Sequence, residues 1–180
     1  SLFRRSKGNV LFIDEAYSLV DDRRGLYGDE AINTLVQEME NNREDIIVIL
    51  AGYPDKMQQF LDTNPGLTSR IAFHINFDDY TEEELYEILI SMASKSGLKI
   101  SDDVYEKVME IFGHACKYKD FGNGRFVRNI YEQALMNQTL RIAKSTGNPS
   151  EKELRTLVAE DFNDLDVKET VKKEGRIIGF

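Results

Sequence analysis

Near its start the chain reads Val10-Leu11-Phe12-Ile13-Asp14-Glu15, four apolar residues followed by two carboxylates. Two of the four apolar residues are β-branched, and such a short run predicts a strand buried on both faces of a parallel sheet. Asp14 and Glu15 come where that strand ends, and adjacent carboxylates at the rim of a core must stay solvated or paired. Open α/β folds bind ligands at this edge of the sheet. The stretch therefore indicates either a metal-assisted site or a strand followed by a polar turn.

Composition limits the class of protein. The chain has 180 residues, 41% of them apolar, which is enough for one large or two small domains. The net charge of −9 argues against a general nucleic-acid or anionic-membrane surface. Cys116 is the only cysteine and His74 and His114 are the only histidines, so neither an internal disulfide nor a zinc site is expected. No apolar stretch approaches the roughly 20 residues of a membrane span and nothing resembles a signal peptide, so we expect a cytoplasmic protein.

The first part of the chain predicts a βαβ unit. An amphipathic helix, capped by Asp29, is indicated by apolar residues at helical spacing, namely Ile32, Leu35, Val36 and Met39. Residues 46–51 form a second apolar run and predict a second strand buried on both faces. A strand, a helix and a strand at this spacing imply parallel pairing. A short helix over residues 55–61 and a third, alternating strand over residues 73–77 are expected to follow.

The later part of the chain predicts helices and no strand. Capping boxes that begin at Thr81 and Ser150 predict the starts of the first and last of these helices. Helical spacing of apolar residues predicts two more helices, over residues 101–118 and 125–144. A charged tail follows from Asp164. We therefore expect an α/β part followed by an all-helical part.

Four strings in one order are more specific together than any one alone. They are residues 11–19 (LFIDEAYSL), 51–55 (AGYPD), 64–70 (NPGLTSR) and 121–129 (FGNGRFVRN). This order resembles the AAA+ ATPases, and closely resembles the branch that contains stage V sporulation protein K and the red-type Rubisco activase CbbX. The final Ile178-Gly179-Phe180 is also similar to the end of that branch. The resemblance covers nearly the whole chain but only about the second half of a complete AAA+ module.

The resemblance implies an α/β fold: the second half of a P-loop AAA+ parallel-sheet domain, followed by an all-α lid. It divides the chain into residues 1–80 from Walker B to the arginine finger, residues 81–163 as the lid with sensor 2, and residues 164–180 as the tail. AAA+ sheets have the strand order 5-1-4-3-2, so the first strand would be missing between the last two predicted here. We expect one of three outcomes: a third strand displaced onto its neighbour, a gap filled by another molecule, or a poorly ordered α/β half.

The resemblance also assigns roles to residues of the α/β part. Asp14 matches the Walker B residue that coordinates Mg²⁺, and Glu15 matches the catalytic base. Arg70 matches the arginine finger, which reaches the γ-phosphate in a neighbouring subunit, although a surface arginine at a helix end is the simpler interpretation. Tyr53 stands at sensor 1, where most family members carry a polar residue. Its phenol can hydrogen-bond a water or phosphate, or it is a packed turn residue.

Two arginines of the predicted lid complete the expected nucleotide site. Arg125 matches sensor 2, which reaches the nucleotide within its own subunit. Arg128, one turn later on the same helix, either assists Arg125 or only pairs with an acidic neighbour. The implied cofactors are ATP and Mg²⁺.

No P-loop of the form G-x-x-x-x-G-K-[S/T] occurs in the 180 residues. Because phosphate binding in this class depends on that loop, this chain is not expected to hydrolyse ATP alone. The chain opens on Ser1 rather than Met, and the resemblance places the P-loop and the pore loop upstream of it.

The implied function is part of a ring ATPase, expected to be a hexamer, that remodels a protein partner as sporulation protein K or CbbX-like proteins do. The alternative is a non-catalytic oligomerisation or interaction fragment. A third interpretation, an AAA+ protein acting on nucleic acid, is disfavoured by the acidic charge.

Overall fold

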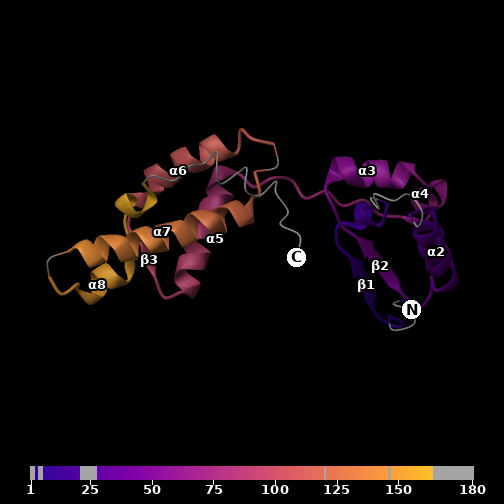
Figure 1. The fold of residues 1–180 in the computed structure, drawn as a ribbon, viewed down its shortest axis with the longest axis horizontal. Helices are drawn as coiled ribbons and strands as arrows, with labels where there is room; N and C mark the ends of the chain where they lie inside the picture. Colours follow the sequence, from indigo (N-terminus) through magenta and orange to yellow (C-terminus); the bar gives the residue numbers. More distant parts are fainter. Residues whose placement is uncertain (1–2, 4–5, 21–27, 120, 146, 164–180) are drawn as a thin grey trace. The chain divides into compact units, whose positions relative to one another are not determined.

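The computed structural model describes residue 3 and residues 6–20, 28–119, 121–145 and 147–163 (Figure 1). The chain forms two compact units, an N-terminal unit over residues 1–77 and a C-terminal unit over residues 78–180. The predicted tail over residues 164–180, including its last three residues, lies outside the described residues.

The N-terminal unit contains the predicted βαβ unit. Strands β1 (Val10–Ile13) and β2 (Ile47–Leu50) pair in parallel, with Val10 opposite Ile47. Helix α2 (Gly28–Asn41) connects them after a 3-10 turn, η1 (Ala16–Leu19). Helices α3 (Pro54–Asp62) and α4 (Pro65–Arg70) follow β2. Helix α2 begins at Gly28, one residue before the Asp29 that was expected to precede it as a cap.

The core of the N-terminal unit covers one face of the two-stranded sheet. Buried side chains from η1, α2, α3 and α4 form it, and Ile13 and Leu50 pack against it; the buried residues are Ala16, Ile32, Leu35, Phe60, Leu61 and Leu67. The alternate strand residues are exposed, with Phe12 at 59% and Ile47 at 63%. The prediction of strands buried on both faces was therefore wrong. A continuous apolar run indicates two covered faces only where helices lie on both sides, and the described helices pack on one.

The predicted third strand is absent from the described residues, because residues 71–80 are extended but make no ladder. Phe73, Ile75 and Phe77 are 85%, 76% and 92% exposed. The segment has the alternation of a strand, but a strand also needs a partner edge. The sheet contains β1 and β2, and the segment has not been displaced onto either of them. Of the three expected outcomes, displacement onto the neighbouring strand is excluded.

The C-terminal unit is mainly helical, in this order: α5 (Glu82–Lys95), β3 (Lys99–Ile100), α6 (Val104–Ala115), α7 (Gly124–Lys144), α8 (Glu151–Leu154), β4 (Thr156–Leu157) and η2 (Ala159–Phe162). The expectation of no strand needs one correction. β3 and β4 form a two-residue parallel ladder, which is too short to leave a periodic signal in the sequence.

Local capping and a shared apolar core fix these helices. Both capping boxes are present: Thr81 accepts from the backbone of Glu84, and Ser150 accepts from the backbone of Glu153. Each such cap contributes about 1 kcal/mol. The core draws residues from every helix face that the spacing predicted as apolar, including Leu85, Leu89, Val104, Val108, Phe112, Phe126, Val127 and Ile130.

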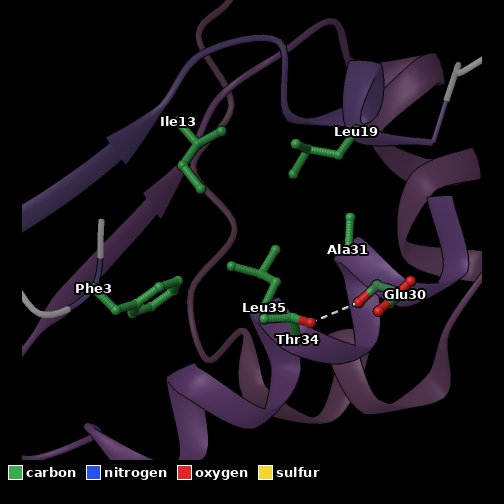
Figure 2. Close-up of a pocket in the computed structure, with 7 residues that line it drawn as sticks. All are labelled: Phe3, Ile13, Leu19, Glu30, Ala31, Thr34 and Leu35. Carbon is green, nitrogen blue, oxygen red and sulfur yellow. Dashed lines mark hydrogen bonds between the residues drawn. The ribbon is translucent and has the colours of Figure 1, made fainter. Parts of the chain in front are cut away.

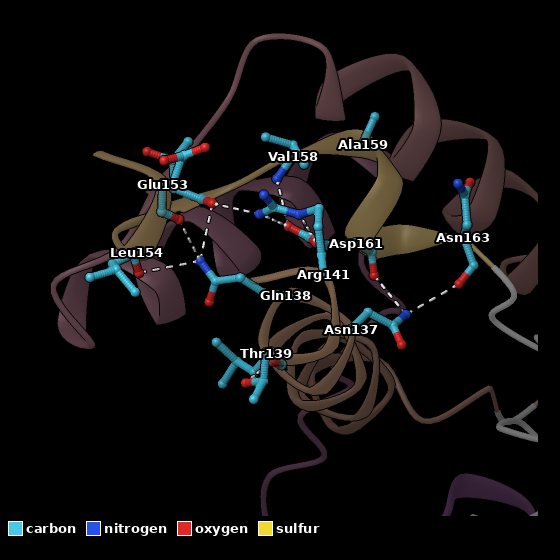
Figure 3. Close-up of polar contacts among 12 residues, drawn as sticks. Asn137, Gln138, Thr139, Arg141, Glu153, Leu154, Val158, Ala159, Asp161 and Asn163 are labelled. Atoms are coloured by element: carbon cyan, nitrogen blue, oxygen red, sulfur yellow. Dashed lines mark hydrogen bonds and ion pairs between the residues drawn. The ribbon is translucent and has the colours of Figure 1, made fainter. Parts of the chain in front are cut away.

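A polar network joins the end of α7 to the segment that follows it (Figure 3). The Arg141 guanidinium donates to both carboxylate oxygens of Asp161, at 2.8 and 3.0 Å. The Asp161 side chain is fully buried, and it also accepts from the backbone of Val158 at 3.0 Å. Gln138 donates to three backbone carbonyls between Glu153 and Thr156. The network therefore fastens α8, β4 and η2 to α7 through paired polar groups.

Candidate functional site

The acidic pair lies in a bulge at the carboxyl end of β1. The Ala51 N–H donates to the Ile13 carbonyl at 2.9 Å, and the Ala16 N–H donates to the Ala51 carbonyl at 3.0 Å. Asp14 and Glu15 therefore stand together opposite one residue of the neighbouring strand, which is the defining count of a β-bulge. Such bulges turn side chains out of the regular alternation. Asp14 and Glu15 therefore depart from the regular alternation of the strand, at the carboxyl end of β1 where the sequence predicted them.

The backbone of Glu15 is strained. Its φ and ψ are both 47°, the left-handed conformation, and its N–H donates to Asp14 Oδ1 at 3.0 Å. A residue with a Cβ loses roughly 1–2 kcal/mol in this conformation relative to the right-handed one. Strain of this kind is concentrated at functional sites, where a fixed side-chain direction is needed. Asp14 is exposed and Glu15 is half-buried, so both carboxylates remain accessible.

Tyr53 follows β2 and forms the N-cap of α3, with 45% of the residue exposed. The ammonium of Lys56 lies 5.5 Å from the centre of the Tyr53 ring and 4.8 Å from that of the Tyr17 ring. A cation within about 6 Å of a ring centre is attracted by the ring face. Lys56 therefore lies over both tyrosine rings. Lys56 was not predicted as a site residue; its position three residues after Tyr53 on a helix was the available signal.

Tyr17 is packed over the end of β2. A Cβ on Gly52 would come within 2.7 Å of the Tyr17 ring, so only glycine fits there without a displacement. Burial, together with the nearby negative charge of the Glu15 carboxylate, raises the pKa of Tyr17 to about 12. The phenol is therefore neutral at physiological pH and adds no charge to the acidic pair.

Arg70 ends α4 and is held within the N-terminal unit. Its Nε lies 3.1 Å from Glu40 of α2, and its Nη1 donates to the Gly66 carbonyl at 3.1 Å. The side chain is 31% exposed. The arginine predicted as a finger is thus partly reachable from solvent, and its guanidinium has a carboxylate partner in its own chain.

Arg125 and Arg128 lie in the C-terminal unit, in the first turns of α7, and both are exposed. No acidic residue occupies the first turn of this helix. Because the N-terminal end of a helix carries a partial positive charge, two exposed arginines there are suited to contact an anion. The structure brings Asp14, Glu15 and Tyr53 to the strand ends of one unit and places the two arginines in the other.

An open apolar pocket of about 560 Å³ lies between β1 and α2 (Figure 2). It is lined by Phe3, Ile13, Leu19, Glu30, Ala31, Thr34 and Leu35. None of the predicted site residues lines it. Within the described part of the chain, no three His, Cys, Asp or Glu side chains are grouped to hold a metal, and no helix is long and apolar enough to cross a membrane. An ion at Asp14 would therefore need further ligands from a bound phosphate and water.

Comparison with known families agrees with this arrangement of an acidic strand end and a helical lid. The family model described as "ATPase family associated with various cellular activities (AAA)" matches residues 1–79, and the one described as "AAA lid domain" matches residues 81–173. The chain therefore belongs to the AAA family of ATPases, and the predicted family is confirmed.

The similar proteins include CfxQ, CbbX and Rubisco activase proteins. A CfxQ homolog of Galdieria sulphuraria is 44% identical over 89% of this chain and 53% of its own length. CbbX of Cereibacter sphaeroides is 41% identical over the same shares. A chloroplastic ribulose bisphosphate carboxylase/oxygenase activase of Cyanidioschyzon merolae is 41% identical over 89% of this chain and 56% of its own length. The chain spans about half the length of these relatives.

Among solved structures, the AAA domain of FIGL-1 is similar with a TM-score of 0.62. The match covers 96% of this chain and 54% of that chain, at 16% identity. At this identity the likeness concerns the fold alone. It confirms the predicted fold class, an α/β AAA fragment followed by a helical lid.

Proposed function

We propose that the chain supplies the Walker B strand and the lid of an ATPase that remodels a protein partner, as part of a ring. The observation that carries the proposal is the strained acidic bulge: Asp14 and Glu15 are turned out of a parallel ladder at the strand edge where α/β proteins bind ligands. The similarity to CbbX and to a Rubisco activase supports a protein partner, with Rubisco as the first candidate and a sporulation partner as the second. We propose a cytoplasmic location for this activity.

In this proposal each residue has one role. Asp14 would hold Mg²⁺, which in nucleotide sites takes one or two carboxylates, waters and phosphate oxygens, so a single exposed carboxylate suffices. The ion supplies neutralising charge to the phosphates. Glu15 takes the proton of the attacking water. Tyr53 hydrogen-bonds that water or a phosphate oxygen through its phenol, as a sensor 1 residue would, and Arg125, with Arg128 one turn later, binds the phosphates from the lid.

Arg70 is proposed as the arginine finger of a neighbouring subunit's site. To reach a phosphate it must leave Glu40, which lies 3.1 Å away and is 48% exposed. Ion pairs at such exposure contribute only about 0–1 kcal/mol, so the exchange for a phosphate is favourable. A hexameric ring would supply the neighbouring site.

The test is ATP hydrolysis by the chain joined to a segment that carries a P-loop. Glu15→Gln should lower turnover by at least about a hundredfold, the usual contribution of a general base, while ATP binding is retained. Glu44→Gln, an exposed glutamate on the loop before β2, is the matched control and should leave turnover unchanged. Equal turnover in Glu15→Gln and the control would mean that Glu15 is not the base.

A second candidate is a non-catalytic oligomerisation module, which the partial exposure of Arg70 at the end of α4 supports. Here the lid and Arg70 complete a site on another molecule. Mixing this chain with a separate P-loop-bearing fragment tests it. Restored hydrolysis that disappears with Arg70→Ala supports this candidate, and restored hydrolysis that is indifferent to Arg70→Ala removes it.

A further inference from the structure

Asn123, just before α7, has an unfavourable backbone conformation. Its φ is 50° and its ψ is −122°, a region that suits glycine and not a residue with a Cβ. The chain has already used glycine at the preceding position, where Gly122 has a φ of 89°. The role of Asn123 therefore belongs to its side chain, because its backbone conformation would suit glycine better.

The Asn123 side chain does not cap the helix. Asparagine is among the best N-cap residues, yet Asn123 forms no side-chain cap to α7. Its Oδ1 accepts from the Tyr80 N–H at 2.9 Å, and its Nδ2 donates to Asp79 Oδ1 at 2.6 Å. Both polar ends of the amide are thus directed to residues more than forty positions earlier in the chain.

The two partners lie where the chain enters the C-terminal unit, which begins at Asp78. On the other side of Asn123, the start of α7 is fixed by apolar contacts: Phe121 is 1% exposed, and its ring packs edge-on against that of Phe126 at 6.0 Å. Arg125 comes two residues after Asn123, and its N–H donates to the Gly122 carbonyl at 2.9 Å. The backbone that carries Arg125 is therefore held from an apolar side and from a polar side.

We propose that Asn123 is a positioning residue: by tying Asp79 and Tyr80 to the start of α7, it makes the entry segment and Arg125 move as one body. Rotation of the lid then takes place before Asp79, in the exposed residues 72–78. A displacement of the entry segment therefore displaces Arg125 by the same amount, because Asn123 joins the two directly. This inference rests on the proposed role of Arg125 in binding the nucleotide.

The first test concerns the tether alone and uses the 180-residue chain. Asn123→Gly removes both hydrogen bonds and suits the backbone conformation, so the fold is retained. We expect amide hydrogen exchange at Tyr80 to become at least about tenfold faster, as expected for loss of a hydrogen bond that closes a local segment. Asp79→Ala, which removes one partner, should have a smaller effect in the same direction. Asn137→Ala, an amide near the other end of α7, is the control and should leave Tyr80 unchanged.

The second test asks whether the tether acts through Arg125, in the chain joined to a P-loop-bearing segment. Asn123→Gly should lower kcat for ATP by roughly five- to tenfold, the range of couplings carried by such contacts, with KM changed less than twofold because the Arg125 charge is kept. Adding Asn123→Gly to Arg125→Ala should have no further effect on kcat.

The outcomes separate the two proposals. Unchanged exchange at Tyr80 in Asn123→Gly overturns the tether. Faster exchange with additive effects of Asn123→Gly and Arg125→Ala on kcat overturns the positioning role. An Arg125→Ala variant with full activity overturns the proposed role of Arg125 and with it the positioning role, while exchange at Tyr80 still tests the tether.

Discussion

The ion pair of Arg141 and Asp161 allows a quantitative prediction about the C-terminal unit. Asp161 is fully buried and Arg141 is 23% exposed. Arg141→Met keeps most of the packing of the side-chain stem but leaves a buried carboxylate with one remaining donor, the Val158 N–H. Breaking a buried pair from one side costs about 3–5 kcal/mol. Because one donor remains and Arg141 is partly exposed, we expect about 3 kcal/mol, a roughly hundredfold change in the folding equilibrium.

The pair of Arg155 and Glu151 is a matched control, since it also joins an arginine to a carboxylate in the same unit, at 3.3 Å. Its side chains are 66% and 79% exposed, so Arg155→Met should cost no more than about 0.5 kcal/mol. The assay is urea unfolding of the 180-residue chain, followed by amide exchange of core residues in α5 and α7. The double variant Arg141→Met/Asp161→Asn should recover part of the loss, because no buried charge remains. Equal losses in Arg141→Met and Arg155→Met would refute this reasoning.

Three further predictions concern the N-terminal unit. In urea unfolding, the free energy of unfolding of Glu15→Gly should be about 1 kcal/mol higher than that of Glu15→Ala, because only glycine relieves the left-handed conformation. Gly52→Ala should cost about 1–3 kcal/mol by thermal unfolding, because its Cβ would lie 2.7 Å from the Tyr17 ring and 2.8 Å from Met57; Gly147→Ala, with open space around it, should be neutral. Since the folded pKa of Tyr17 is raised from 10.0 to about 12, its contribution to stability is complete below pH 10 and is lost as the pH rises toward 12. Absorbance at 295 nm should show a late tyrosine titration, and Tyr17→Phe should lower its amplitude by one tyrosine, since burial also raises the pKa of Tyr86.

Features encoded by neighbouring residues were predictable from the sequence. The capping boxes at Thr81 and Ser150 depend on residues three positions apart, and both are present. The parallel pairing of β1 with β2 followed from the spacing of strand, helix and strand. The acidic pair could be placed at a strand end because the apolar run stops at Ile13.

Features that depend on distant partners were not predictable. Phe12 would be buried only under a helix on the second face of the sheet, and residues 73–77 would form a strand only beside a partner strand. Neither run of residues contains information about such a neighbour. Likewise, the hydrogen bond between Asn123 and Asp79 joins residues 44 positions apart, and no local pattern predicts it. The bulge at the acidic pair was missed because the left-handed position is filled by Glu15 and not by the glycine that usually signals it.

The segment from Ile71 to Phe77, which is exposed from Ala72 onward, has a consequence for the behaviour of the chain in concentrated solution. Seven consecutive residues there contain no proline and no Asp, Glu, Lys or Arg, and three of them are large apolar residues facing solvent. Such windows are the usual starting points of amyloid-like association. Charged residues stand at both borders, Arg70 on one side and Asp78 with Asp79 on the other. These flanking charges oppose such association by electrostatic repulsion. Because salt screens that repulsion, we expect the aggregation rate of the chain to rise with ionic strength.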